Sequence, residues 1–153
     1  MQSLQDHYAP NNRCFGCGPA NDKGLRIKSF PDGDSLVAHF RPEPHHVAFG
    51  QVLNGGICGA LLDCNSNWAA AYHMMQRDGT DQLPSTVTSD FHVVLKRPTP
   101  IGSIVVVQSR VVSSDGPRAV VEAYLEADGE VTATCRGTFV VVEEGHPAYH
   151  RWD

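Results

Sequence analysis

The segment from Gln51 to Tyr72 constrains the fold most, because it is a long helical stretch that is apolar on nearly every side. At about 100° per residue from Ile57, a stripe of apolar residues falls within roughly 60° of one line. These are Ala60, Leu61, Cys64, Trp68, Ala71, Tyr72 and Met75. Asp63 lies about 240° round, on a face whose other members are small. They are Gly56, Gly59, Ser66 and Ala70. A solvated face would carry Lys, Glu and Arg, so we expect a helix buried on most sides with one carboxylate inside.

Asp63 and the start of this helix each allow a structural and a catalytic interpretation. A buried charge is costly unless it is paired or used, so Asp63 either satisfies polar groups in a packed core or takes part in a reaction. Before the helix, Asn54 is a good N-cap and is followed by Gly55 and Gly56. The free N–H groups of a first helical turn attract anions, and a plain capped helix start is the alternative.

The flanking sequence predicts strands on both sides of the helix. Short apolar runs at 25–30 and 35–40 flank the turn Pro31-Asp32-Gly33-Asp34 and predict a hairpin. Four later runs rich in Val, Thr, Tyr and Phe, joined by short turns, predict an antiparallel meander. They cover residues 87–96, 103–113, 119–127 and 131–143. This order gives an α+β domain in which an antiparallel sheet wraps around one long central helix.

Length and charge narrow the class of protein. The chain has 153 residues, which fits a single domain over 1–153, and residues 1–13 have no period and are expected to form a mobile or draped arm. The net charge is −5, with no basic run, so nucleic-acid binding is disfavoured. No apolar run approaches the roughly 20 residues that span a bilayer. The polar N-terminus lacks an apolar signal core, so we expect a cytoplasmic protein that does not enter the membrane.

The five cysteines are expected to be mostly free thiols, because their number is odd and no export signal precedes them. Cys14 and Cys17 form a Cys-x-x-Cys pair, which is half of a zinc site. Two further ligands would have to come from residues such as His45 or His46, or from a partner subunit. A redox dithiol normally lies between a strand and a helix, unlike this pair. From the sequence we therefore expect neither a metal nor a cofactor.

The central segment resembles the signature of hotdog-fold acyl-CoA thioesterases of the phenylacetate-pathway type, within the 4-hydroxybenzoyl-CoA thioesterase-like superfamily. In that signature a His-Gly-Gly is followed by an acid on the same helix. Gly55 and Gly56 match the glycines, and Asp63 matches the acid at the same separation (63 − 54 = 9), while Asn54 replaces the usual His. The likeness extends from Cys14 to Val142. It includes a Cys-x-x-Cys-Gly opening over 14–24, expected to be a knuckle packed on the sheet, and a Pro-rich turn at 96–102.

The resemblance implies a hotdog fold and a thioesterase that hydrolyses an acyl thioester of coenzyme A or of acyl carrier protein. The N–H of Gly55, with Gly56 as a second donor, would stabilise the oxyanion. Asp63 would be the general base on water or would attack directly to give an anhydride. Thr88, counted back from the Pro-rich turn, would orient the water. The family likeness also implies a homodimer or a dimer of dimers (a homotetramer), with Asp63 and Thr88 contributed by opposite chains.

The same resemblance suggests residues that bind substrate. His46 and Phe49 match the acyl-pocket wall, and Gln51 replaces a residue that is commonly small. Arg118 and Arg136 are candidates for the coenzyme A phosphates, with ordinary surface positions as the alternative.

Asn54 cannot titrate as His does, although its amide still forms hydrogen bonds. This substitution leaves a second possibility open, a non-catalytic hotdog dimer that binds acyl thioesters. An acyl-thioester hydratase is a third possibility, although those enzymes pair an Asp and a His in a different motif.

Overall fold

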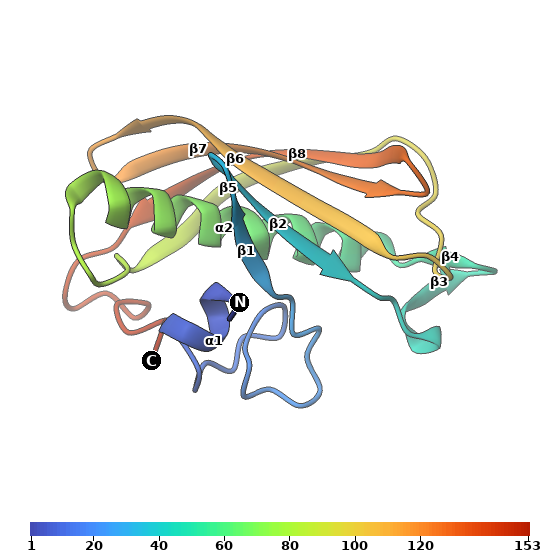
Figure 1. Cartoon of the computed structure of the whole chain (residues 1–153), viewed down its shortest axis with the longest axis horizontal. Coiled ribbons are helices and arrows are strands. Elements are labelled where there is room, and N and C mark those ends of the chain that lie inside the picture. Colours follow the sequence, from blue (N-terminus) through green and yellow to red (C-terminus); the bar gives the residue numbers. More distant parts are fainter.

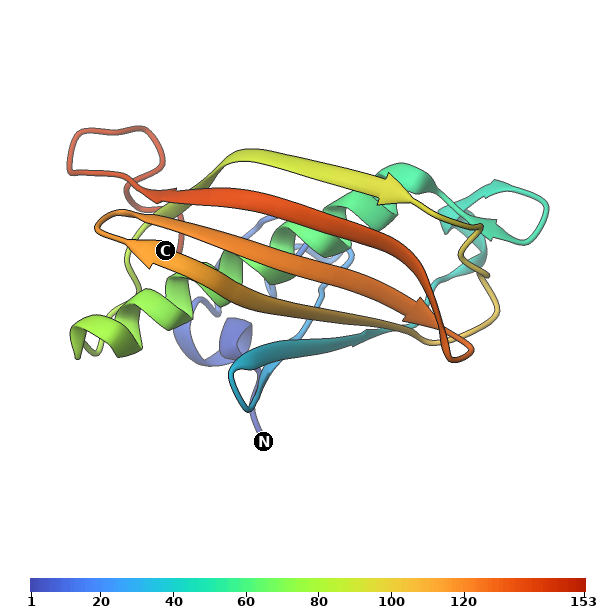
Figure 2. The same cartoon turned by 90° about the horizontal axis from the view of Figure 1, so that it is seen from above.

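The protein, described by a computed structural model over residues 1–153, places a six-stranded antiparallel sheet against one long helix. The helix, α2 (Gly55–Asp78), runs along one face of the sheet (Figures 1 and 2). The sheet order is β1-β2-β6-β7-β8-β5. The strands are β1 (Ser29–Asp32), β2 (Ser35–Phe40), β5 (Thr86–Leu95), β6 (Val105–Asp115), β7 (Arg118–Ala127) and β8 (Glu130–Val141). This architecture confirms the predicted α+β domain, in which an antiparallel sheet packs against one long helix.

Helix α2 begins and ends at the residues that its capping chemistry favours. The Asn54 side chain accepts the N–H of Ile57 at 3.1 Å, so Asn54 is the N-cap. The helix continues past Gln76, where the sequence predicted a loop, and its last residue is Asp78. Gly79 follows as the C-cap, with a φ of 65° in the left-handed region. Trp68 is 1% exposed in the middle of the helix. The prediction of a helix buried on most sides is therefore correct.

The strand order corrects the predicted meander. Strands β6, β7 and β8 do form consecutive antiparallel pairs, but β5 pairs with β8 at the far edge and not with β6. The first hairpin is confirmed, although β1 starts only at Ser29. β1 is four residues long, includes Pro31 and forms the opposite edge of the sheet.

The segment before the helix forms a small unit that projects at the helix N-terminus (Figure 2). It contains a 3₁₀ turn, η1 (Pro44–His46), and a two-stranded sheet of β3 (Val47–Phe49) and β4 (Val52–Leu53). The sequence predicted only a loop here. β4 is tied to the Pro-rich turn, because Leu53 N–H donates to the carbonyl of Thr99 at 2.8 Å.

The N-terminal segment is packed on the fold, which agrees with the draped and not the mobile alternative for this arm, and part of it is helical. Residues Leu4–Tyr8 form the short helix α1, and Leu4 and Gln5 are buried. The Gln5 side chain donates to Ser29 Oγ at 2.9 Å and accepts the N–H of Ser29 at 2.7 Å. Ser29 in turn donates to Asn65 of α2 at 2.7 Å. A buried polar chain of this kind needs all its partners, which is why the arm is held in place.

The N-terminal segment and the C-terminal tail lie on the side of α2 that faces away from the sheet (Figure 1). The tail after β8 is irregular, as predicted, but Trp152 packs on Trp68 with 4.4 Å between ring centroids. The helix is thus covered by the sheet on one side and by the two chain ends on the other. No helix combines the length and apolar character needed to cross a bilayer.

Candidate active site

Asp63 lies on α2 opposite the edge strand β5, where it meets Thr88. The Thr88 hydroxyl donates to Asp63 Oδ1 at 2.6 Å, and the pair is partly buried. A β-bulge separates Thr88 from Asp90 in the pairing of β5 with β8. Bulges re-aim side chains, and this one occurs directly beside Thr88. The sequence named both residues, and the structure brings them together.

This contact corrects one expectation about the two residues. The family resemblance implied that Asp63 and Thr88 would come from opposite chains. They form a hydrogen bond within one chain, because β5 returns along α2 and places the two residues side by side.

The surroundings of Asp63 raise its pKa, so its carboxyl group holds a proton more readily than it would in water. Burial raises the pKa of Asp63 above its ordinary value, while the Thr88 hydrogen bond and the positive charge of Arg151 act against the rise. A charge on Cys14 raises the pKa further. Burial, together with the charge of Asp63, raises the pKa of the Cys135 thiol to about 11, so that thiol stays neutral.

Arg151 is a member of this site that the sequence did not indicate. It lies in the irregular tail, where no period or motif marks it, and only the folded chain brings its charge near Asp63. Its guanidinium donates to the carbonyl of Thr86 at 3.0 Å and lies 4.2 Å from the Trp152 ring centroid.

The start of α2 supplies free N–H donors. Gly55 and Gly56 are the first two residues of the helix, so their N–H groups have no helical acceptor. The Asn54 oxygen is engaged by the N–H of Ile57. A Cβ on Gly55 would lie 3.1 Å from Leu95, so the helix start is close to the end of β5. The donors that the sequence predicted are therefore present at a capped helix terminus.

Helix geometry separates these donors from the acid. Gly55 and Asp63 are eight residues apart on a continuous helix (63 − 55 = 8), which is about 12 Å at 1.5 Å per residue. One thioester carbonyl cannot reach both groups of a single chain. A site that uses both groups needs the donors of one copy and the acid of another.

Neither a family model nor a curated protein matches the sequence. Solved structures do resemble it. A thioesterase superfamily protein from Shewanella loihica PV-4 has a TM-score of 0.70 and 24% identity, covering 92% of this chain and 100% of its own. The thioesterase HI1161 from Haemophilus influenzae has a TM-score of 0.69 and 18% identity, covering 80% and 84%. The Escherichia coli PaaI protein of the phenylacetic acid degradation operon has a TM-score of 0.66 and 17% identity, covering 78% and 81%.

This chain has the hotdog fold. The predicted substrate-binding residues His46, Phe49 and Gln51 all precede α2, but they lie in different surroundings. His46 is buried, and its Nδ1 accepts the N–H of Glu43 at 3.0 Å, so it closes a capping box of η1. Phe49 is 69% exposed on β3, and Gln51 lines a hollow of about 390 Å³ that also includes Arg41 and Ile101. His46 therefore stabilises the turn η1 in the segment before α2.

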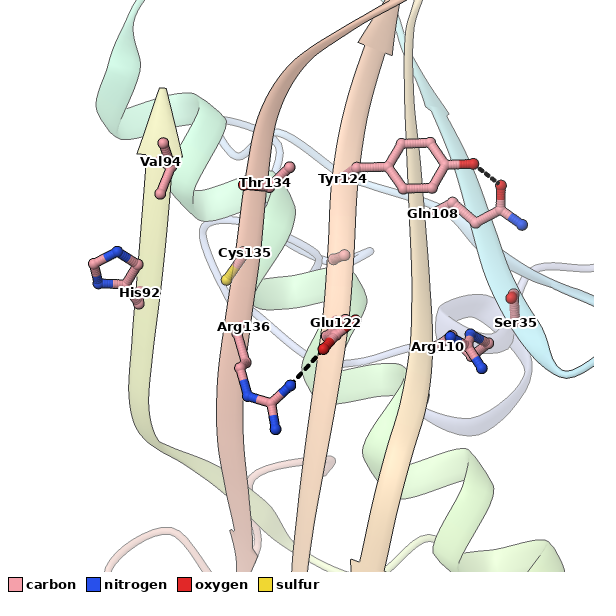
Figure 3. A pocket seen from close by; sticks show the side chains of 11 residues that line it. Ser35, His92, Val94, Gln108, Arg110, Glu122, Tyr124, Thr134, Cys135 and Arg136 are labelled. Atoms are coloured by element: carbon pink, nitrogen blue, oxygen red, sulfur yellow. Dashed lines mark hydrogen bonds and ion pairs between the residues drawn. The ribbon is translucent and has the colours of Figure 1, made fainter. Parts of the chain in front are cut away.

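Arg118 and Arg136 lie on the outer face of the sheet, opposite α2. The residues next to them in the strands, Ala119 and Cys135, are buried. Arg136 forms an ion pair with Glu122. This pair lines a hollow of about 460 Å³ that Figure 3 shows on the side of the strands away from the helix. The fold therefore does not bring either arginine to Asp63 within one chain.

The cysteine knuckle packs on α2 and not on the sheet as predicted. Cys14 Sγ lies 4.0 Å from Cys64 Sγ, and the indole N–H of Trp68 donates to Cys17 Sγ at 3.3 Å. Hydrogen bonds from the neighbouring thiols hold the pKa of Cys14 well below its usual range. All five cysteines are free, as the sequence predicted. The sequence did not indicate that Cys64 would join the pair.

Proposed function

We propose that the protein is an acyl thioester hydrolase that acts as a homodimer, with acyl-CoA as its substrate class. The observation that carries this proposal is Asp63 itself. It is a partly buried carboxylate with a raised pKa that accepts a hydroxyl hydrogen bond from Thr88. It lies on the helix whose glycine start offers free N–H groups. Acids with perturbed pKa values cluster at functional sites, where burial and a specific partner set their protonation.

The reaction follows from the chemistry of these groups. Asp63 takes a proton from water while the oxygen of that water attacks the thioester carbonyl, and Thr88 orients the carboxylate. The carbonyl becomes an oxyanion, which accepts the N–H of Gly55 and Gly56 from the other copy. The carbon–sulfur bond then breaks, and the leaving thiolate receives the proton from Asp63. Direct attack by Asp63 to form an anhydride uses the same residues.

The second copy is expected along β5. This strand is the open edge of the sheet, and Phe91 and Leu95 are 44% and 57% exposed there. The opposite edge, β1, is short and carries Pro31, which cannot donate to another strand. A second copy paired on β5 would cover the apolar side chains and bring its own helix start near Asp63. A dimer of dimers would then require a further contact, for which the outer sheet face is free.

A second function is favoured by a different observation. The Asn54 amide oxygen is occupied as a cap, and none of the four main surface hollows is lined by Asp63. A non-catalytic dimer that binds acyl thioesters is consistent with both facts. The free cysteines fit a reducing compartment, so we place either activity in the cytoplasm.

Free thiol release from short, medium, long and aryl acyl-CoAs, with an acyl carrier protein thioester beside them, distinguishes the two functions. We expect release by the wild type and a loss of about 10²–10⁴-fold in Asp63→Asn, since that is the usual contribution of a general base. Asp78→Asn is the matched control, because Asp78 is an exposed acid at the other end of the same helix. A folded dimeric wild type that binds acyl-CoA but releases no thiol would establish the binding function instead.

A further inference from the structure

Three thiols from two distant parts of the chain converge beside the central helix. Cys14 and Cys17 come from the knuckle, and Cys64 comes from the middle of α2. Their Sγ atoms all lie within 4.8 Å of one another, and Cys14 and Cys64 are 4.0 Å apart. Cys58 lies on the same helix but does not join them, since its thiol donates a hydrogen bond to Thr99 of the Pro-rich turn.

We propose that Cys14, Cys17 and Cys64 form a binding site for one zinc ion that ties the N-terminal knuckle to α2. Zinc–thiolate bonds are about 2.3 Å long, so two sulfurs on one tetrahedral zinc lie about 3.8 Å apart. The Cys14–Cys64 separation of 4.0 Å already agrees with this spacing. Thiolates are soft ligands and select Zn²⁺ over hard ions such as Mg²⁺ or Ca²⁺.

The surroundings of the three sulfurs support a thiolate site. The Trp68 indole donates to Cys17 Sγ at 3.3 Å, so a donor from α2 meets a sulfur of the knuckle. Such N–H donors spread the negative charge of coordinating sulfurs and fix their orientation. A metal site needs these outer contacts as much as its ligands.

The backbone of the knuckle is shaped to admit Cys64. A Cβ on Gly16 would lie 2.3 Å from Cys64 Sγ, so a larger residue here would displace that sulfur or the loop. The loop closes through the N–H of Gly18, which donates to the carbonyl of Cys14 at 2.8 Å. A Cβ on Gly18 would lie 2.4 Å from the nitrogen of Cys14. Gly16 therefore lets the Cys-x-x-Cys turn lie close to the helix, and Gly18 lets the turn itself close tightly.

The site has three protein ligands and an accessible fourth position. Cys14 is only partly buried, so an ion and a water molecule can enter from that side. A disulfide is the competing use of these thiols. It would join only two of the sulfurs and would need them at about 2.05 Å, half the observed distance. The convergence of three sulfurs beside an indole N–H donor favours the ion.

The test is zinc binding by the full-length chain, purified with a reductant and without chelators. We expect one Zn²⁺ per chain by elemental analysis, and a thiolate-to-metal charge-transfer band in the near ultraviolet when Co²⁺ replaces Zn²⁺. Competition with a chromophoric chelator should show binding weakened at least about 100-fold in Cys17→Ser and Cys64→Ser. Cys58→Ser and Cys135→Ser are matched controls, because both are buried cysteines outside the site. They should bind zinc as the wild type does.

Trp68→Phe keeps the three sulfurs and removes the indole donor, together with part of the buried ring that packs on Trp152, so its unfolding is measured beside its zinc binding. It tests the site if a cysteine variant fails to fold. We expect it to weaken zinc binding about 10–100-fold. A reduced wild type that binds no zinc, or a Cys64→Ser variant that binds it as tightly as the wild type, overturns the proposal. So does a disulfide among these cysteines, found by mass spectrometry in the protein as isolated. The inference does not depend on thioester hydrolysis and can fail or succeed separately from it.

Discussion

The protonation of Asp63 is governed at the residue scale by a few named neighbours. Thr88 donates a hydrogen bond to the carboxylate, and Arg151 supplies a positive charge, while burial opposes both. Only the ionised carboxylate can accept a proton from water. The raised pKa therefore sets the acidic limit of the proposed reaction.

We expect kcat/KM to fall as the pH drops through the raised pKa of Asp63, above the ordinary value of 3.8. Thr88→Val removes a hydrogen bond that favours the ionised form, so the acidic limb should move to higher pH. The measurement is thiol release across the pH range. Thr134→Val, a threonine on the outer sheet face, is the control and should leave the limb in place. An unmoved limb in Thr88→Val would show that another group controls the profile.

Helix α2 organises the site at the element scale because its start and its different faces meet different partners. Asn54 caps its start, Asp63 meets β5, and Cys64 meets the knuckle. Asn65 is buried and donates to Ser109 of β6 at 2.8 Å. The position of the acid is therefore fixed by contacts on every side of the helix.

The contact of the knuckle with α2 predicts a specific stability effect. In Gly16→Ala the new methyl group would lie 2.3 Å from Cys64 Sγ, so either the Cys64 side chain or the loop must shift. We expect the free energy of unfolding to fall by about 1–3 kcal/mol, as for other overpacked sites. Gly102→Ala is the control, since a Cβ there meets nothing within 4 Å and its φ is not positive.

Denaturant unfolding of both glycine variants in the presence of a chelator measures this packing effect apart from metal binding. The Gly102 variant should stay within about 0.5 kcal/mol of the wild type. Equal stability of the Gly16 variant and the wild type would mean that the knuckle does not pack on the helix in solution.

The whole molecule is incomplete as a catalyst if it remains a single chain. The free N–H groups at Gly55 lie about 12 Å along the helix from Asp63, at 1.5 Å per residue. The open edge of β5 leaves Phe91 and Leu95 exposed on the helix side of the sheet. Dimerisation and activity are therefore expected to be lost together.

We expect Leu95→Asp and Phe91→Asp to give monomers by size-exclusion chromatography with light scattering, and thiol release at least about 100-fold lower, as when oxyanion donors are lost. Val94→Asp is the matched control, since Val94 is 41% exposed on the same strand but lines the outer hollow (Figure 3). It should remain at least dimeric and active. Fully active monomers of the Leu95 variant would show that one chain contains a complete site.

The sequence determined the elements of this protein, because local periodicity and turn chemistry act over a few neighbouring residues. The helix start at Asn54, the six strands of the main sheet and the partly buried acid Asp63 followed from such signals, whereas β3 and β4 did not. The pairing of β5 with β8, the docking of α1 and the approach of Cys64 and Arg151 did not. These contacts join residues far apart in the chain, and no local pattern encodes them. Only the tertiary structure decided them, since packing and buried hydrogen bonds select which distant groups meet.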